Sequence, residues 1–354
     1  MRLPRLFRKR RPAPEPHRMP GFDEAYYLRA YPDVERFPGP PLQHYRLFGW
    51  REGRDPSAGF SSNGYLAANP DARDSGSDPL THFLEIGLSA GRTGWRKDPA
   101  LPPPAPRFPI DQFEGPLRAF VEEAAIFMYW TSQDLAEPPG AQAWRALYPK
   151  FKVFTDRDVI PLLPEDFVPV FTSIRLPSAK SDIARIFLLR AHGGLYVDAH
   201  VGPAAPQQLV ETMRDLDHRD IIVFGKGWAM KTETDFDLMN TVMAARRGAR
   251  ELDGIIDQLI HNVLEHKKKE AVTDDYVPYD LFHVTGTALI VSAFFEHRPP
   301  RPQIKAELQN RVAVHFMKNN GDSGFTLYAH DSYRLPDSHW SERQRRERFF
   351  LDAG

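Results

Sequence analysis

Residues 181–201 read SDIARIFLLRAHGGLYVDAHV, and this stretch decides the fold of the larger, carboxy-terminal part of the chain. Apolar residues recur at helical spacing through positions 183–189, which predicts a helix. Ser181 is suited to cap its start. Gly193-Gly194 predicts its end, because glycine adopts backbone conformations that other residues resist. The apolar residues 195–197 then predict a short buried strand.

Polar residues gather near the carboxyl end of this strand. Asp198 and His200 leave the strand one residue apart, at the edge where open α/β sheets bind ligands. Asp182 and Arg185 lie three residues apart and therefore on one face of the preceding helix. A divalent ion held at Asp198 and His200 can neutralise a diphosphate leaving group. The segment therefore predicts a site for a phosphorylated ligand.

Strand and helix patterns alternate on the amino-terminal side of this segment. Residues 125–130 form an apolar run typical of a buried parallel strand. Residues 141–147 predict a short helix, residues 151–154 a second strand, and Thr155-Asp156 the start of another helix. Alternation of this kind predicts a doubly wound α/β domain.

The segment resembles the signature of bacterial glycosyltransferases with a DXD-type sugar-binding motif and of related capsular polysaccharide synthesis proteins (glycosyltransferase family 32-like). The likeness extends over most of residues 124–340 and implies a GT-A fold, Rossmann-like with a mostly parallel sheet. It implies three catalytic residues. Asp182 would bind donor-sugar hydroxyls, Arg185 sugar or phosphate oxygens, and Asp198 the ribose or a metal.

The same resemblance implies residues that bind the nucleotide sugar. These are Tyr129, Trp130, Thr155, Asp156, Ser181, Gly193, Gly194 and Tyr196. Two of them have an equally good structural explanation: Trp130 suits core packing as well as base stacking, and Asp156 suits a helix cap as well as a uracil contact. Residues 240–246 resemble the acceptor-side helix of the family, and residues 284–287 its Thr-Gly-Pro turn.

A divalent metal is expected, with Asp198, His200 and His330 as ligands. The chain has no cysteine, so thiolate ligands are excluded. His200 departs from the commoner Asp, although the mucin-type N-acetylgalactosaminyltransferases use Asp-x-His with a metal. An imidazole nitrogen favours Mn²⁺ over Mg²⁺, because Mg²⁺ prefers oxygen. His315 is the alternative to His330 as third ligand.

An internal repeat precedes this domain. Residues 22–54 and 60–92 share twelve identities at a period of 38 residues. Each copy predicts two short helices, the first capped by Asp23 or Ser61 and the second starting near a proline. The identities are Phe22, Tyr27, Leu28, Ala30, Pro32, Asp33, Pro41, Leu42, His44, Gly49, Gly53 and Arg54, with their counterparts 38 residues later. Packing is a better explanation of the repeated histidine than metal binding, because no carboxylate or second histidine accompanies either copy.

These patterns divide the chain into four parts. Residues 1–20 form a basic tail with seven Lys or Arg and one Glu, which we expect to be disordered. Residues 21–95 form a small all-α tandem-repeat module, expected to be autonomous. Residues 96–118 are a proline-rich linker. Residues 119–354 form the GT-A domain.

The composition limits the expected partners and cellular location of the protein. The formal net charge is −1, so no overall field favours a nucleic-acid partner. The amino terminus lacks the apolar stretch of a signal peptide, and no apolar run approaches 18 residues. We therefore expect a cytoplasmic protein. The basic residues 1–20 suit a peripheral contact with anionic lipid at the inner membrane face.

Two further segments bear on the acceptor. Lys267-Lys268-Lys269 are expected to form the solvated end of a helix over 252–269, with contact to an anionic or lipid-linked acceptor as the alternative. Residues 271–280 are acidic and aromatic, which suits a mobile acceptor loop.

The preferred interpretation is a hexosyltransferase that retains anomeric configuration. It would move a hexose from a nucleoside-diphosphate sugar, with UDP as the expected nucleotide, to a glycan or lipid-linked acceptor in surface polysaccharide synthesis. A catalytically degenerate protein that binds glycans or partner enzymes through the repeats is the alternative. A nucleotide-sugar hydrolase or pyrophosphorylase is disfavoured, because no Gly-rich basic amino-terminal loop is present.

Overall fold

A computed structural model describes residues 19–97, 113–131, 138, 140–227, 237–296, 303–327 and 340–351. The predicted basic tail therefore falls almost wholly outside the described residues, as does most of the predicted linker. His330, the proposed third metal ligand, also lies outside them.

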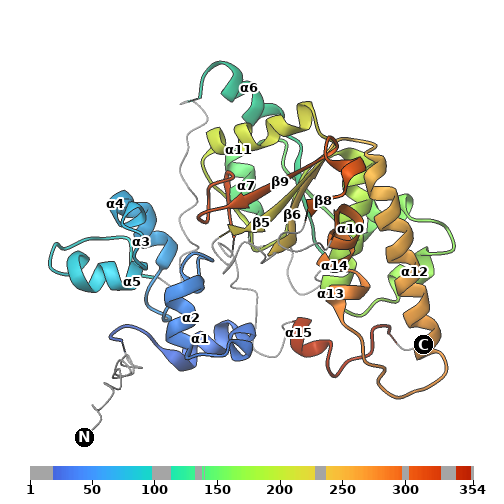
Figure 1. Ribbon diagram of the computed structural model, residues 1–354, viewed down its shortest axis with the longest axis horizontal. Helices are drawn as coiled ribbons and strands as arrows, with labels where there is room; N and C mark the ends of the chain where they lie inside the picture. The colour runs from blue at the N-terminus through green and yellow to red at the C-terminus, as the bar shows by residue number, and fades with distance from the viewer. Residues whose placement is uncertain are drawn as a thin grey trace, which may run out of the picture.

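The centre of the molecule is a six-stranded sheet of order β2-β1-β3-β6-β5-β9 (Figure 1). All its strands run parallel to one another except β6, which is antiparallel to both neighbours. The strands are β1 (Ile126–Tyr129), β2 (Lys152–Phe154), β3 (Gly194–Val197), β5 (Ile221–Lys226), β6 (Leu238–Ala245) and β9 (Val312–Met317). The mixed α/β class and the mostly parallel sheet are confirmed, and they fit a GT-A-like fold.

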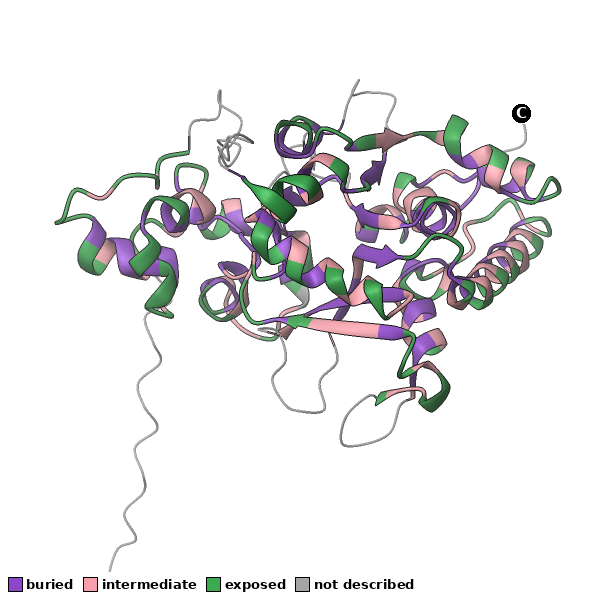
Figure 2. Cartoon of the chain, turned by 90° about the horizontal axis from the view of Figure 1, so that it is seen from above, coloured by how far each residue is buried: buried purple, intermediate pink, exposed green. Residues whose placement is uncertain are grey.

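Helices cover both faces of this sheet. One face packs against α10 (Pro177–His192), α12 (Asp253–Glu270) and α14 (Thr287–Phe294), and the other against α6 (Gly115–Glu123), α7 (Ala141–Leu147) and α11 (Pro206–Met213). Strand β3 shows the alternation: Tyr196 joins the first core, whereas Leu195 and Val197 join the second. Buried strands lie between helices whose outer sides are exposed (Figure 2).

Short elements complete the described domain. The helices are α8 (Asp156–Val159), α9 (Val168–Thr172), α13 (Leu281–Val284) and α15 (Trp340–Arg343). Two-residue strands pair outside the main sheet: β4 (Gly202–Pro203) with β10 (Phe325–Thr326), and β7 (Phe295–Glu296) with β8 (Gln303–Ile304).

Two predicted elements differ from the structure. Helix α10 begins at Pro177, so Ser181 lies inside the helix and does not cap it; proline is favoured at the first helical position, where its missing N–H costs nothing. Residues 240–246 were expected to be helical, but most of them belong to β6. There the sheet provides partners on both sides, β3 and β5, and tertiary pairing decides the conformation.

The two repeat copies fold alike. Copy one has α1 (Glu24–Ala30) and α2 (Pro41–His44), and copy two has α3 (Ser62–Ala68), α4 (Pro70–Asp74) and α5 (Pro79–His82). In copy one a 3₁₀ turn, Pro32–Arg36, replaces α4, and in both copies one π-helical turn extends the last helix, through Tyr45–Gly49 and Phe83–Gly87.

Equivalent side chains make equivalent bonds in the two copies. The hydroxyl of Tyr27 lies 3.0 Å from Nδ1 of His44, and that of Tyr65 lies 2.9 Å from Nδ1 of His82. Burial lowers the pKa of His44 to about 4, which keeps its ring neutral. Both histidines are therefore packing residues.

The first copy contacts the α/β domain. Nζ of Lys226, at the end of β5, lies 3.3 Å from Oε1 of buried Glu52. A Cβ built on Gly53 would stand 3.0 Å from the carbonyl oxygen of Leu327, so the two backbones are close. Helix α6 begins at Gly115, and Phe113 is buried in the second core.

Candidate functional site

The carboxyl edge of the sheet carries a buried cluster of charges. Arg185 projects from α10 and donates from Nη1 to Oδ1 of Asp182, at 2.6 Å, and from Nη2 to Oδ1 of Asp198, at 2.8 Å. Its guanidinium also lies 4.8 Å from the centre of the Tyr196 ring. One cation thus joins two carboxylates, one from a helix and one from the end of β3. We call Asp182, Arg185 and Asp198 the edge triad.

Each carboxylate of the edge triad is held by further donors. Asn240 of β6 donates to Oδ1 of Asp182 at 2.7 Å, and Thr285 donates to Oδ2 at 2.9 Å. Tyr196 donates to Oδ1 of Asp198 at 2.8 Å. Oδ2 of Asp198 makes no hydrogen bond within the described part of the chain, and the Asp198 side chain is 21% exposed. The hydrogen bonds to Oδ1 therefore orient the Asp198 carboxylate, and Oδ2 is left available for a ligand.

Burial opposes charge in this cluster. Burial raises the pKa of Asp182 to about 6, against the opposing effect of Arg185. Arg185 is 2% exposed, and its Nε is buried without a hydrogen-bond partner among the described residues. Burial acts to lower the Arg185 pKa, but Asp198, Tyr196 and Asp182 outweigh it, so the pKa is raised. Since the contacts of Asp182 with Arg185, Asn240 and Thr285 are all to donors, they stabilise its ionised form.

The nucleotide-binding residues expected at the same edge divide into two groups. Ser181 Oγ lies 2.8 Å from the Tyr196 hydroxyl, which extends the edge triad. Tyr129, at the end of β1, donates to Asp156, whose other oxygen accepts from Lys180 at 2.9 Å. Of the Tyr129–Asp156–Lys180 group, Lys180 lies on α10, two residues before Asp182 and five before Arg185.

Thr155 and Trp130 have structural contacts as well. Thr155 and Asp158 form a capping box at the start of α8, with the Thr155 N–H donating to Asp158 at 2.8 Å. Trp130 donates its backbone N–H to Phe154 at 2.9 Å, and its side chain is half-buried. Asp156 is the first residue of α8, and its carboxylate bonds Tyr129 and Lys180.

Gly193 and Gly194 lie at the opposite end of β3 from Asp198. Their φ angles are +66° and +98°, a backbone region that favours glycine. A Cβ on Gly194 would stand 2.2 Å from the carbonyl oxygen of Ala125, and one on Gly193 would stand 2.4 Å from the Arg247 nitrogen. The two glycines therefore allow close backbone packing, and the structure does not bring them to the edge triad.

Of the three predicted metal ligands, the structure describes Asp198 and His200, and His200 is buried. The alternative ligand His315 is not brought to the edge triad. It lies on β9, three strands from β3, with Nε2 2.7 Å from Asp215. Within the described ranges no group of three or more His, Asp or Glu could hold a metal alone.

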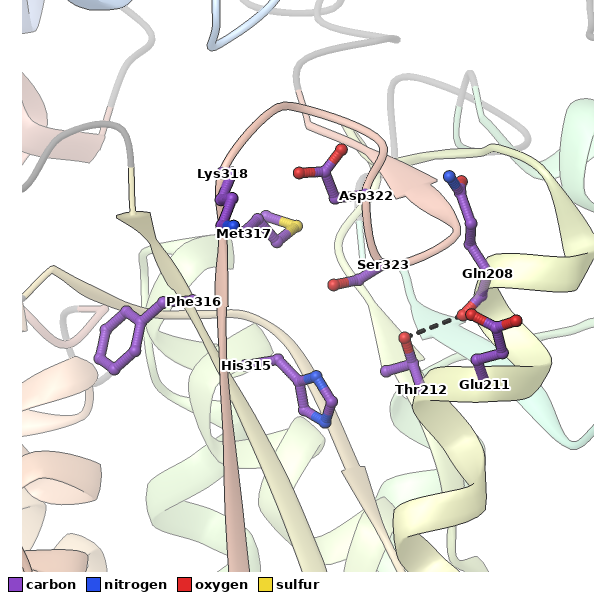
Figure 3. Close-up of a pocket in the computed structure, with 9 residues that line it drawn as sticks. All are labelled: Gln208, Glu211, Thr212, His315, Phe316, Met317, Lys318, Asp322 and Ser323. Atoms are coloured by element: carbon purple, nitrogen blue, oxygen red, sulfur yellow. Dashed lines mark hydrogen bonds between the residues drawn. The ribbon is translucent and has the colours of Figure 1, made fainter.

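His315 lines a separate polar hollow of about 340 Å³ between β9, α11 and the turn after β9. Figure 3 shows His315, Ser323 and Thr212 around this hollow, with Phe316 directed away from it. It lies on the outer strand of the sheet, away from the edge triad.

The roles of three site residues were not predicted from the sequence. Asn240, Thr285 and Lys180 bond the site carboxylates from three different elements. In the sequence, Asn240 and Thr285 belong to segments that resemble the acceptor-side helix and the Thr-Gly-Pro turn of the family. The available signal was a polar residue at the start of an apolar strand, in the case of Asn240.

The loop 271–280 is not free, contrary to the mobile loop expected. Tyr276 donates to the backbone oxygen of Gln344 at 2.6 Å, and Tyr279 donates to that of Glu347 at 3.1 Å. The backbone N–H of Leu281 donates to Oε1 of Gln344 at 3.0 Å. The carboxy-terminal segment therefore holds this loop, which leads to Thr285.

The fold and site define an α/β protein with a charged cluster at the ligand-binding edge of a mostly parallel sheet. Residues 140–216 match the family model "Glycosyltransferase sugar-binding region containing DXD motif". The matched region contains the whole edge triad. The match supports a glycosyltransferase that binds a nucleotide sugar.

Other comparisons add little. No curated protein matches the chain. The PaToxG glycosyltransferase is similar in structure, with 13% identity, a TM-score of 0.30, and coverage of 48% of this chain and 67% of its own. The UDP-bound glycosyltransferase domain of the YGT toxin has 10% identity, a TM-score of 0.26, and coverage of 40% of this chain and 49% of its own. Likenesses this low do not define an activity. No helix in the described ranges could cross a membrane.

Proposed function

We propose that the protein transfers a hexose from a nucleoside-diphosphate sugar, preferably a UDP-sugar, to a glycan or lipid-linked acceptor in surface polysaccharide synthesis. The observation that carries the proposal is the edge triad. Two carboxylates joined by one buried arginine stand where parallel strands present ligands, inside the region that matches the sugar-binding model. We further propose a cytoplasmic setting.

The residues of the site have separate tasks in this proposal. Asp182 is fixed by Arg185, Asn240 and Thr285 and accepts hydrogen bonds from donor-sugar hydroxyls. Arg185 has both terminal nitrogens engaged, so it acts mainly by fixing the two aspartates and by supplying positive potential beside the diphosphate. The aromatic residues at the end of β1 would contact the base.

The residues present fit a divalent metal. Oδ1 of Asp198 is already occupied by Arg185 and Tyr196, which orients Oδ2 for a ligand. Magnesium-like ions commonly take only one or two protein ligands and complete their shell with substrate phosphates. Asp198 and His200 would hold the ion, and His330 is proposed as a third ligand. When bound, the ion would offset charge developing on the departing diphosphate. Mn²⁺ is favoured because His200 supplies nitrogen.

Retention of the anomeric configuration is part of the proposal and rests on the resemblance of residues 181–201. Proton NMR of the product would report it directly, since the α and β anomers give different coupling constants. An inverted product would remove this element while leaving the transferase intact.

The test is a panel of nucleotide sugars assayed with the purified full-length protein. We expect one donor to raise the melting temperature and to release nucleoside diphosphate when acceptor or water is present. Absence of stabilisation and of release with every donor would overturn the transferase. That result would favour the alternative, a protein that binds glycans or partners through its repeats.

A further inference from the structure

The carboxy-terminal segment and the end of α12 form one continuous surface. The backbone N–H of Phe349 donates to Oε1 of buried Glu270 at 2.7 Å. Arg348 donates from Nη2 to the carbonyl oxygen of Glu270 at 2.8 Å and from Nη1 to that of Thr273 at 2.9 Å. Hydrogen bonds thus join residues about 75 positions apart in this surface.

A hollow of about 420 Å³ opens in this surface. Lys267 and Arg348 line it, together with the apolar Phe350 and Leu351 and the hydroxyl-bearing Thr172 and Ser173. The ammonium of Lys267 stands 5.7 Å from the centre of the Phe350 ring, and Lys267 forms no salt bridge within the described ranges. The hollow thus combines positive charge with an apolar wall.

Basic residues continue around the hollow. Lys268 and Lys269 are exposed at the end of α12, and Arg345 is exposed on the carboxy-terminal segment. Acidic groups are also present. Glu270 is buried, accepts from backbone N–H groups and forms a salt bridge with Arg348, whose Nε lies 3.5 Å from its Oε2. Glu265 pairs with Lys268 at 2.6 Å. Lys267, Lys269 and Arg345 form no salt bridge within the described residues, so they supply the positive charge of the outer surface beside the hollow.

Two large apolar side chains are exposed at its rim. Val272 is 84% exposed and follows Ala271, which lines the hollow, and Leu351 is 49% exposed and lines it directly. Exposed apolar residues flanked by lysines are typical of surfaces that lie in the interface of a bilayer. Asp274 and Asp275 bound this surface on one side and limit its extent.

We propose that Lys267, Lys269, Val272, Arg348 and Leu351 dock the protein on an anionic phospholipid bilayer. The lipid phosphate would be bound at the hollow by Lys267, while Val272 and Leu351 insert among the acyl chains. The residues of this docking surface are distinct in sequence from the basic tail, and the proposed docking does not depend on transferase activity. It would orient the protein at the membrane through a hydrogen-bonded part of the fold.

The test is binding of the full-length protein to phosphatidylcholine vesicles with and without phosphatidylglycerol. Each lysine near an anionic surface contributes about fivefold in affinity, so Lys267→Gln/Lys269→Gln should weaken binding on the order of twentyfold. Val272→Ser/Leu351→Ser should weaken it about threefold or more. The matched control is Lys150→Gln/Lys152→Gln, which removes the same charge from exposed positions elsewhere. We expect the control to change binding less than twofold.

The same pairs are compared in a second background whose tail lysines and arginines are replaced by glutamine. The lysine effect should persist there, since it does not involve the tail. Equal losses in the two lysine pairs would overturn the proposal, as would absence of vesicle binding in both backgrounds. Inorganic phosphate is the competing probe. Binding of inorganic phosphate that depends on Lys267, without vesicle binding, would replace the bilayer with a soluble phosphate ligand. A changed melting temperature with unchanged vesicle binding would reduce the lysines to a helix-end role.

Discussion

Within the described residues, two networks of alternating charge at the same sheet edge differ in what surrounds them. The edge triad joins Asp182, Arg185 and Asp198. The second network lies between the first repeat copy and strands β5 and β6, and we call it the repeat network. It joins Asp33, Arg54, Glu52, Lys226 and Asp237. Both lie at the carboxyl edge of the sheet, because Lys226 ends β5 and Asp198 follows β3. In the edge triad two acids share one cation, whereas Glu52 has a cation on each side.

The pKa values show the consequence. Burial raises the pKa of Asp182 to about 6, because its single cation is shared. Burial also acts to raise the pKa of Glu52, but Arg54 and Lys226 outweigh it and the pKa is lowered. Both carboxylate oxygens of Glu52 pair with protein cations. Oδ2 of Asp198, in contrast, has no hydrogen-bond partner within the described residues. A buried arginine between acids is therefore not evidence of a ligand site without such an opening.

The largest expected effect is on turnover, which should depend on the edge triad and not on the repeat network. Asp182→Asn keeps the shape of the side chain and removes the charge, so turnover should fall about 10²-fold or more. Asp33→Asn, the matched change in the repeat network, should leave turnover within about twofold. Donor kinetics of the two folded variants would measure this. Unchanged kinetics in Asp182→Asn would remove this residue from the site.

The next largest effect concerns metal dependence, which we expect at the edge triad alone. His200→Ala should lower metal-dependent activity about tenfold or more, and His200→Asp should retain much of it with a shift toward Mg²⁺. Metal affinity should fall as pH drops through the histidine range, because a ligating imidazole must be neutral. The control is His315→Ala, which should not change metal dependence. Robust turnover in excess chelator across pH 5.5 to 8 would exclude the metal.

The contributions of Asp182 and Glu52 to folding stability should change with pH in opposite directions. Asp182 is ionised above about pH 6, so kcat/KM should decline about tenfold per pH unit below 6, and Asp182→Asn should lack this limb. In stability, the raised pKa means that the folded protein binds the Asp182 proton more tightly, so this group favours folding as pH falls toward 4. Glu52 has a lowered pKa, and its stabilisation is lost as pH falls below about 4.5. Thermal unfolding of Asp182→Asn and Glu52→Gln across pH 4 to 8 would show both signs.

The repeat network should act on stability alone. Glu52→Gln removes the buried carboxylate between Arg54 and Lys226, which keep only the more exposed Asp33 and Asp237, and should cost about 3 kcal/mol of unfolding free energy. Turnover should stay within about twofold. Ala90→Gln is the equivalent position of copy two, is exposed, and should have no measurable effect. If Glu52→Gln also reduced turnover tenfold, the repeat would belong to the catalytic site.

The smallest effect tests the similarity of the copies. Tyr27→Phe and Tyr65→Phe each remove a hydrogen bond to a buried histidine and should each cost about 1 kcal/mol. The two losses should be alike, since the two bonds have nearly the same length. Chemical denaturation provides the measurement, and a loss confined to one copy would contradict the equivalence.

Much of the local structure followed from local pattern. The helix end at Gly193, the strand 194–197, the helix 141–147 and the capped start at Asp156 depend on residues close in sequence. Helix length was less accessible, and the start of α10 lies four residues before Ser181. Residues 240–246 were assigned to the wrong element, because strand pairing with β3 and β5 is a property of the whole sheet.

The sequence by itself determined the repeat, the helix–Gly-Gly–strand order, and the placing of Asp182, Arg185 and Asp198 at one edge. These depend on spacing and on backbone chemistry that few residues satisfy. Only the tertiary structure decided which groups hold those side chains. Asn240 and Thr285 reach Asp182 from 58 and 103 residues away, and Lys226 reaches Glu52 from 174 residues away. Such partners are chosen by packing of distant elements, since a buried charge is tolerated only where the fold brings donors to it.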